Sequence, residues 1–352
     1  MTGWDKRGKI EKIFLFDSSL YRQKGTGETV GKGGHMKAKK WAVFVCAVIF
    51  FLAGCQKKDE AVSAPEPEES QSSAEEKEPD PNWPVEVRDV VLTEKPETII
   101  SLSPALTEIV YELGGSLSGV SNYCDFPQEV SSLERYGDSS IPDMEALQKH
   151  PPDLLLSSTP LPKTDQEILE SLDVAIAVFP RAEDFDGMEK TYVDLGILLE
   201  GTETGKENGE TVFAALRERY DALCNKADGH GMFGIWLRDV PLMMATGDTF
   251  EGKLMENALG IKNDAVAYEH WQYPPEKAVD LYPDVIFYDK SIDKDYFAGT
   301  QVYNTTDAYK QRRMYPFDAL PFERQSGRMV TELEHMAQAF AEGNPQGDGQ
   351  EG

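Results

Sequence analysis

The side chains most often used in catalysis and metal binding are few in this chain and are scattered along it. Five histidines occur among 352 residues, and no two of them have the spacing of metal ligands, so a zinc site is not expected. The stretch GTETGK (Gly201–Lys206) has a glycine spacing one residue short of a phosphate-binding loop, and it follows no predicted strand. No nucleophile–base pair is recognisable. The sequence therefore predicts a binding protein without a metal or cofactor, not an enzyme.

The four cysteines divide into two pairs. Cys46 and Cys55 lie in the opening segment, whereas Cys124 and Cys224 lie in the globular part. The second pair is compatible with one disulfide and equally with two free thiols. Cys124 is expected to be a small packed residue.

Cys55 follows a short apolar segment and is placed for covalent modification. Three lysines between 37 and 40 precede the apolar segment 41–53, which is too short to span a bilayer as a helix but is typical of a secretory signal. The closing Leu-Ala-Gly-Cys resembles the lipobox of bacterial lipoproteins, in which the cysteine sulfur receives a diacylglycerol and the chain is cut before it. An ordinary signal peptide with a chance cysteine is the alternative. We expect residues 36–54 to be a lipoprotein signal peptide and Cys55 to be the lipid-attachment residue.

The segments on either side of this signal have no pattern of a folded domain. Residues 55–84 are rich in Glu, Ser, Pro and Ala and contain few apolar residues, which predicts an acidic, disordered tether. Residues 1–35 have no secretory character although they precede the signal. We expect translation to begin at Met36 and 1–35 to be a mis-annotated upstream extension. Detection of a peptide from residues 1–34 by mass spectrometry would contradict this.

Two glutamates occur in matching contexts far apart in the chain. Glu145 and Glu276 each follow a proline by two or three positions and precede a Pro-Asp pair and an apolar strand, with six residues between the glutamate and the pair. A single acid in the first turn of a helix is favoured by the helix dipole alone. Its recurrence is better explained by two equivalent lobes, whose acidic side chains could bind a two-fold-related partner with basic sockets.

The elements that position these residues begin at Val85. Strands and helices alternate over 85–185, a long helical stretch covers 186–227, and the alternation resumes over 228–342, leaving 343–352 as a disordered tail. Alternation of this kind predicts a parallel sheet with helices on its faces. The predicted fold class is therefore α/β, with two lobes and a helical connection. The formal net charge of −27 argues against nucleic acid as a partner.

Two motifs carry a family resemblance. Ile99–Val130, IISLSPALTEIVYELGGSLSGVSNYCDFPQEV, resembles the start of the cobalamin- and iron-complex-binding proteins of ABC importers, and Pro321–Val330, PFERQSGRMV, resembles the motif that opens their last helix. The resemblance covers residues 85–340. It implies two Rossmann-like lobes joined by a single long rigid helix, with the ligand in a cleft between the lobes at the carboxyl ends of strands. It also implies that Glu145 and Glu276 dock onto arginines of a permease dimer.

The resemblance further implies which side chains contact the ligand. Aromatic rings suit a broad, flat, partly apolar macrocycle, although core packing is the alternative for each of them. An arginine after a strand would suit the carboxylates of haem or a siderophore, unless it is simply solvated at the surface. The expected cleft residues are Tyr123, Trp236, Trp271, Phe322, Arg324 and Arg181.

The predicted function is that of a monomeric solute-binding protein, anchored by lipid on the extracytoplasmic face of the cell membrane. It would deliver a cobalamin-type corrinoid to an ABC permease dimer and its ATPase. An iron–siderophore complex or haem is the alternative ligand. An extracellular enzyme or a ligand sensor on the same scaffold is the alternative from another class.

Overall fold

The computed structural model describes residues 80–238 and 242–343, with the side chains of Pro275 and Glu276 left out. The predicted segments 1–35 and 36–54, most of the tether and nearly all of the tail lie outside the described residues. In the part of the chain that is described, none of the helices combines the length and the apolar character needed to cross a membrane.

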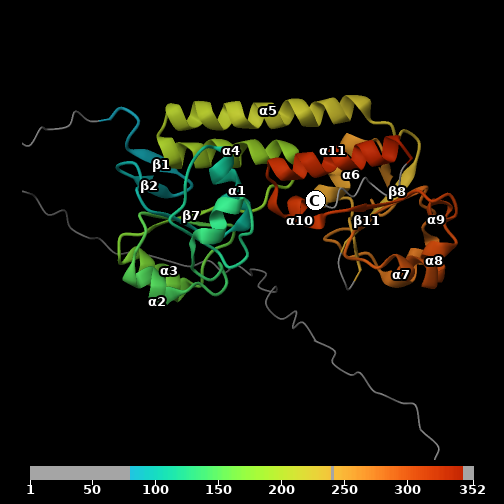
Figure 1. The fold of residues 1–352 in the computed structure, drawn as a ribbon, viewed down its shortest axis with the longest axis horizontal. Helices are drawn as coiled ribbons and strands as arrows, with labels where there is room; N and C mark the ends of the chain where they lie inside the picture. The colour runs from blue at the N-terminus through green and yellow to red at the C-terminus, as the bar shows by residue number, and fades with distance from the viewer. Residues whose placement is uncertain (1–79, 239–241, 344–352) are drawn as a thin grey trace, which may run out of the picture. The chain divides into compact units, whose positions relative to one another are not determined.

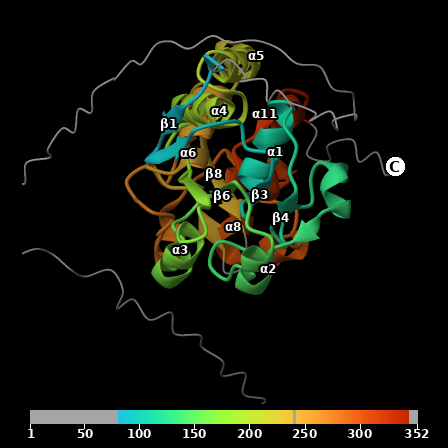
Figure 2. The same ribbon diagram turned by 90° about the vertical axis from the view of Figure 1, so that its left-hand side faces the viewer.

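The N-terminal lobe is built on a five-stranded parallel sheet with the strand order β5-β4-β3-β6-β7. The lobe opens with an antiparallel hairpin of β1 (Val85–Val87) and β2 (Val90–Leu92). The sheet strands are β3 (Ile99–Ser101), β4 (Gly119–Val120), β5 (Glu134–Arg135), β6 (Leu154–Ser157) and β7 (Ala175–Val178). The helices are α1 (Pro104–Glu112), η2 (Gln128–Ser132), α2 (Met144–Lys149) and α3 (Lys163–Glu170). Figure 2 shows this lobe, with α2 and α3 on the opposite side from α4 and α5.

Local sequence explains where these elements begin. The Ser103 hydroxyl accepts a hydrogen bond from the Leu106 N–H at the start of α1, and Pro104 occupies the first helical position. The Asp143 carboxylate caps α2 in the same way. All four residues of β6 are buried, as expected of a central strand covered on both faces.

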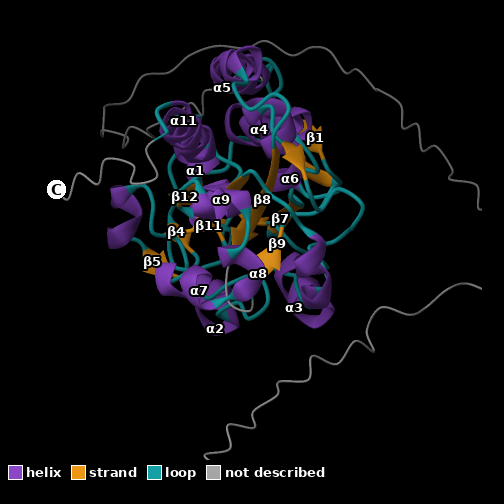
Figure 3. Cartoon of the chain, turned by 90° about the vertical axis from the view of Figure 1, so that its right-hand side faces the viewer, coloured by secondary structure: helices purple, strands orange, loops and turns teal. Residues whose placement is uncertain are grey.

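The C-terminal lobe repeats the parallel arrangement, with the strand order β10-β8-β11-β12 and β9 antiparallel to β8. Its strands are β8 (Phe233–Arg238), β9 (Met243–Met244), β10 (Lys262–Asn263), β11 (Val285–Asp289) and β12 (Met314–Phe317). Its helices are α6 (Phe250–Leu259), η3 (Pro275–Asp280), α7 (Lys294–Gly299), α8 (Gln301–Asn304), α9 (Asp307–Lys310), α10 (Ala319–Arg324) and α11 (Gly327–Ala341). Figure 3 shows this lobe toward the viewer.

The helical stretch expected over 186–227 consists of two helices, α4 and α5. The first helix, α4 (Phe185–Glu200), ends at Gly201, whose φ of 90° breaks the helix. The second, α5 (Thr204–Lys226), then returns along the first and continues past it, so that it lies beside both lobes (Figure 1). Its 23 residues correspond to a length of about 34 Å.

Side-chain contacts tie α5 to both lobes. The Asn208 amide donates to the Leu113 carbonyl oxygen at the end of α1, 2.8 Å away. The Arg219 guanidinium binds the Glu334 carboxylate of α11 through two hydrogen bonds of 2.6 and 2.9 Å. The helix therefore bridges the lobes along its length.

Glycines allow α4 and α5 to pack with their backbones in contact. A Cβ added at Gly205 would lie 2.0 Å from the Gly196 carbonyl oxygen, and one added at Gly196 would lie 2.2 Å from the Gly205 carbonyl oxygen. Because both obstacles are backbone atoms, they cannot be relieved by a side-chain rotation. The close approach of the two helices therefore requires glycine on each of them.

We expect Gly205→Ala to lower the free energy of unfolding by about 1–3 kcal/mol, because the added methyl overpacks this contact. Gly299→Ala is the matched control, since a Cβ there meets nothing within 4 Å. The control should change the free energy of unfolding by less than about 1 kcal/mol. Chemical denaturation of both variants measures the difference, and equal stabilities would contradict the close packing of α4 on α5.

Candidate functional site

The strand order of the N-terminal lobe reverses between β3 and β6, and a cavity of about 710 Å³ lies at the carboxyl ends of its strands. A crevice at such a reversal is where open α/β sheets bind ligands. Ser103, Tyr123, Ser158 and Arg181 line the cavity from the ends of β3, β4, β6 and β7. The C-terminal lobe contributes α10 and the residue after it, including Glu323 and Arg324. This interlobe cavity is the candidate functional site.

Tyr123 lies on the wall of the interlobe cavity with 67% of its surface exposed. Arg135 holds the loop that carries Tyr123. The guanidinium of Arg135 donates to the carbonyl oxygens of Ser121 and Cys124 at 2.9 and 2.7 Å. Arg135 therefore fixes the loop from which Tyr123 lines the cavity.

The cysteines of the described residues are both free. Cys124 is buried beside the Thr107 hydroxyl, with 3.2 Å between sulfur and oxygen, and burial raises the pKa of its thiol. Cys224 is half-buried in α5. Of the two alternatives that the sequence left open, the structure has the free thiols. Within the same described residues, no group of three or more His, Cys, Asp or Glu side chains is arranged to hold a metal ion.

Arg324 lies at the cavity wall, but its guanidinium is already bound by carboxylates. It donates to Glu108 of α1 at 2.8 Å and to Asp125 in the Tyr123 loop. Partial burial alone would raise the pKa of Asp125, but the hydrogen bond and charge of Arg324 outweigh this and hold that pKa below its usual range. Arg324 therefore joins the C-terminal lobe to two elements of the N-terminal lobe.

Glu108 is the centre of this contact between the lobes, and its carboxylate is fully buried. Besides Arg324 it accepts a hydrogen bond from Arg328 at 2.8 Å and another from the Ser326 hydroxyl. Burying a carboxylate is costly unless charged and polar partners of this kind surround it. This role could not be predicted from the sequence, because the residues that meet here lie more than 200 positions apart.

Arg181 makes a second contact between the lobes at the wall of the cavity. Its guanidinium donates to the buried Glu251 carboxylate of α6 at 2.9 Å and to the Phe322 carbonyl oxygen at 2.7 Å. Beside it, the Gln325 side chain binds the backbone N–H and carbonyl oxygen of Ala182 at 2.8 and 2.9 Å. Arg181 thus lines the cavity, and its guanidinium has an internal carboxylate partner.

Two of the expected cleft aromatics are in the hydrophobic core instead. Trp236 is 0% exposed and Phe322 is 1% exposed, and neither lines the interlobe cavity. Their rings pack edge to face with centroids 4.8 Å apart, and Trp236 also lies 4.7 Å from the ring of Phe317. The physical reason is that both faces of the C-terminal sheet are covered, so a strand residue such as Trp236 has no route to solvent.

Trp271 is half-buried and lies outside the set of residues that line the cavity. It has a left-handed backbone, with φ of 60°, and its N–H donates to the Thr246 hydroxyl at 3.1 Å. The Arg238 guanidinium lies 4.3 Å from its ring centroid and also binds Glu323 of the cavity wall at 3.2 Å. Trp271 is therefore connected to the cavity through two charged side chains and does not contact it directly.

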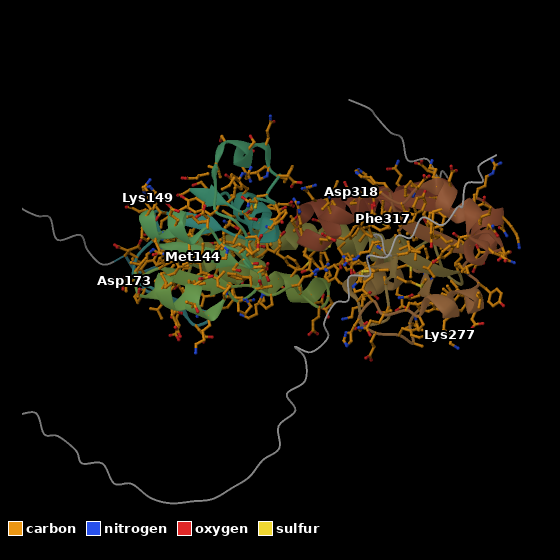
Figure 4. All side chains as sticks on the ribbon, turned by 90° about the horizontal axis from the view of Figure 1, so that it is seen from below. Met144, Lys149, Asp173, Lys277, Phe317 and Asp318 are labelled. Carbon is orange, nitrogen blue, oxygen red and sulfur yellow. The ribbon has the colours of Figure 1, made fainter. Side chains whose placement is uncertain are left out.

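The matching glutamate contexts correspond to equivalent places in the two lobes. Glu145 is exposed in the first turn of α2, and Glu276 lies in η3, where its side chain is outside the described part. Seen from below in Figure 4, Met144 and Lys149 of α2 lie in the N-terminal lobe and Lys277 of η3 lies in the C-terminal lobe. Each lobe therefore has one of the two glutamates, Glu145 or Glu276, in a short helix of its described backbone.

The aspartates of the two Pro-Asp pairs have the same structural role. The Asp153 carboxylate accepts from the backbone N–H of Thr98 at 2.7 Å, just before the neighbouring strand β3. The Asp284 carboxylate accepts from the backbone N–H of Phe233 at 3.0 Å, at the start of the neighbouring strand β8. In each lobe the pair therefore fastens the start of one central strand to the next, which explains why the pattern recurs.

Comparisons with known proteins agree with this architecture. The family model described as periplasmic binding protein matches residues 99–319. The uncharacterized ABC transporter substrate-binding lipoprotein YvrC of Bacillus subtilis (strain 168) is 24% identical over 318 residues, which are 86% of this chain and 97% of that protein.

Two solved structures share the fold. The periplasmic vitamin B12 binding protein BtuF of Vibrio cholerae has a TM-score of 0.57 and 20% identity, covering 71% of this chain and 99% of that one. The periplasmic haem binding protein HutB of Vibrio cholerae has a TM-score of 0.60 and 17% identity, covering 68% and 97%. At these identities the likeness shows the fold alone.

Proposed function

The chain belongs to the periplasmic binding protein family, and from this membership we propose that it is an extracytoplasmic receptor that delivers a cobalamin-type corrinoid to an ABC importer. The observation that carries the proposal is the interlobe cavity at the carboxyl ends of the N-terminal strands. Its volume of about 710 Å³ lies within the usual range for ligand sites. The family is one of binding proteins, which argues against the enzymatic alternative.

The relative from Bacillus subtilis supports the transport role, because it is named as an ABC transporter substrate-binding lipoprotein and matches along most of both chains. Its name also supports attachment to the membrane through lipid, and in this chain Cys55 is the residue proposed to carry the lipid. Cys55→Ser should move the protein from the membrane fraction to the soluble fraction. Retention of the variant in washed membranes would contradict an anchor at this residue.

The ligand is tested by titrating tryptophan fluorescence with cyanocobalamin. We expect saturable quenching with a dissociation constant below about 10 μM, a free energy of binding near −7 kcal/mol. Parallel titrations with haem and with ferric siderophores test the alternative ligands. Quenching by one of these, without any response to cyanocobalamin, would reject the corrinoid while keeping the receptor role.

Tyr123→Ala should weaken binding of the same ligand by about 10-fold, which is about 1.4 kcal/mol for one aromatic contact. Tyr282→Ala is the matched control, because Tyr282 is also exposed but does not line the interlobe cavity. Equal affinities for the two variants would remove Tyr123 from the binding site.

A further inference from the structure

Among the described residues that line the interlobe cavity, both arginines, Arg181 and Arg324, are bound by carboxylates of the protein itself. From this balance we propose that the site selects ligands that are uncharged or cationic and discriminates against ligands that carry free carboxylates or a net negative charge. The inference rests on the proposed function, because it takes the interlobe cavity as the ligand site. It divides the candidate ligands by chemistry: amide-rimmed corrinoids and uncharged or cationic iron complexes on one side, and haem and anionic iron complexes on the other.

Arg181 is the first of the two cations on the cavity wall. Replacing its partner, Glu251, by a ligand carboxylate would be energetically unfavourable. The Glu251 carboxylate that it binds is buried, and the second oxygen of that carboxylate has no hydrogen-bond partner in the described structure. If a ligand carboxylate drew Arg181 away, Glu251 would remain as a buried and uncompensated charge, which is strongly unfavourable. The charge of Arg181 is therefore balanced by Glu251 through Nη2, while 40% of the arginine side chain remains exposed.

Arg324 is the second cation and is still more strongly engaged. Its side chain is almost fully buried and is shared between Glu108 and Asp125. The Asp125 carboxylate lies on the cavity side, with 56% of its side chain exposed, so an approaching anion would meet that negative charge together with the arginine. Repulsion of this kind is a common means of excluding unwanted ligands.

The surrounding charges repeat the same balance. Arg328 shares Glu108, and Arg238 binds Glu323, which itself lines the cavity. Among the described residues, this cluster has four arginines and four carboxylates: Arg181, Arg238, Arg324, Arg328, Glu108, Asp125, Glu251 and Glu323. The net charge of −27 for the whole chain adds a field that repels anions over a longer range.

The other polar groups on the wall are uncharged. They include the hydroxyl groups of Ser103, Ser158, Thr159 and Tyr123. Hydroxyl groups both donate and accept hydrogen bonds, so they match the amide or hydroxamate groups at the rim of an uncharged complex. The cavity thus offers apolar surface and neutral hydrogen-bonding partners, and each arginine among its described residues already has a carboxylate partner.

The test uses two pairs of probes that differ only in carboxylates. Cyanocobalamin is compared with the derivative in which one propionamide has been hydrolysed to the acid, and haem dimethyl ester is compared with haem. For the pair that binds to the wild-type protein, we expect the member without the free carboxylate to bind at least 10-fold more tightly than the acid member. Equal or tighter binding of the acid member would overturn the inference while leaving the receptor role intact. Failure of all four probes and of ferric siderophores to bind would overturn the proposed function and this inference with it.

A protein variant tests whether the discrimination between the probes comes from the charge balance of the cavity or from the shape of the probes. Glu251→Gln keeps the size of the side chain and releases the charge of Arg181, so it should tighten binding of the acid member by about 10-fold and leave the uncharged member nearly unchanged. Asp125→Asn tests the same point at the other arginine, should Glu251→Gln fail to fold. Glu167→Gln, an exposed carboxylate on α3, is the control and should change neither affinity. Unchanged selectivity in a correctly folded Glu251→Gln or Asp125→Asn protein would overturn the inference.

Discussion

The double substitution Glu145→Ala with Glu276→Ala should abolish ligand uptake while leaving the affinity of the receptor for its ligand within about two-fold. Each glutamate is proposed to bind an arginine of one permease subunit. Truncating one partner of a charge pair that is buried in an interface costs about 2–5 kcal/mol, which corresponds to about a 30-fold or larger loss of docking affinity at each site. Two such losses together would remove productive docking at cellular concentrations.

The measurement is uptake of labelled ligand by cells or by the permease and its ATPase in proteoliposomes, with ligand affinity measured separately on the purified variant. Glu210→Ala is the matched control, because Glu210 is an exposed glutamate on α5, on the opposite side of the N-terminal lobe from α2 (Figure 1). The control should support normal uptake. Loss of ligand affinity in the double variant would mean instead that these acids belong to the ligand site.

The second large effect is expected in the contact between the lobes, where Glu108→Ala should lower the free energy of unfolding by about 3–5 kcal/mol. The substitution leaves Arg324 almost fully buried with Asp125 as its remaining carboxylate, and it leaves Arg328 and Ser326 without their common partner. Removing one of the two carboxylates that balance a buried arginine costs more than removing an exposed surface pair. Chemical denaturation with a folded baseline verified by circular dichroism gives the difference.

The control for this prediction is Glu167→Ala, which removes the exposed pair with Lys163, 3.6 Å apart and with 64% of the glutamate side chain exposed. Such surface pairs contribute about 0–1 kcal/mol, so the control should be nearly as stable as the wild type. If the Glu108→Ala variant and the control were equally stable, the Glu108 carboxylate would not compensate the charge of the arginines around it.

Much of the fold could be predicted from the sequence, because the deciding signals are local. The alternation of strands and helices predicted two α/β lobes, and Ser103 with Pro104 predicted the start of α1. The repeated Pro-Asp pairs, found from their spacing alone, mark equivalent strands of the two sheets. In each case the signal and the structure that it specifies lie within a few residues of each other.

The remaining features depend on contacts that no local pattern reports. The helical character of 186–227 was expected, but the reversal of direction between α4 and α5 at Gly201 was not, because helical periodicity continues on both sides of it. Trp236 and Phe322 were expected at the cavity because an aromatic residue at a strand end or at the start of a helix has the same pattern whether it faces a ligand or the core. The pairing of Arg181 with Glu251, 70 positions away, likewise has no signature in either segment.

The glycine-packed hairpin of α4 and α5 has a mechanical consequence. Large domain closure requires a few loop residues that absorb wide changes of φ and ψ, whereas α5 is an uninterrupted helix fastened at Asn208 to one lobe and at Arg219 to the other. A continuous helix bonded to both lobes allows little movement between them. The radius of gyration measured by solution scattering should therefore hardly differ between the empty and the loaded receptor. The rate of ligand exchange would then be set by small movements of side chains at the cavity mouth. A transporter would have to distinguish the loaded from the empty receptor by contacts at the rim of the cavity.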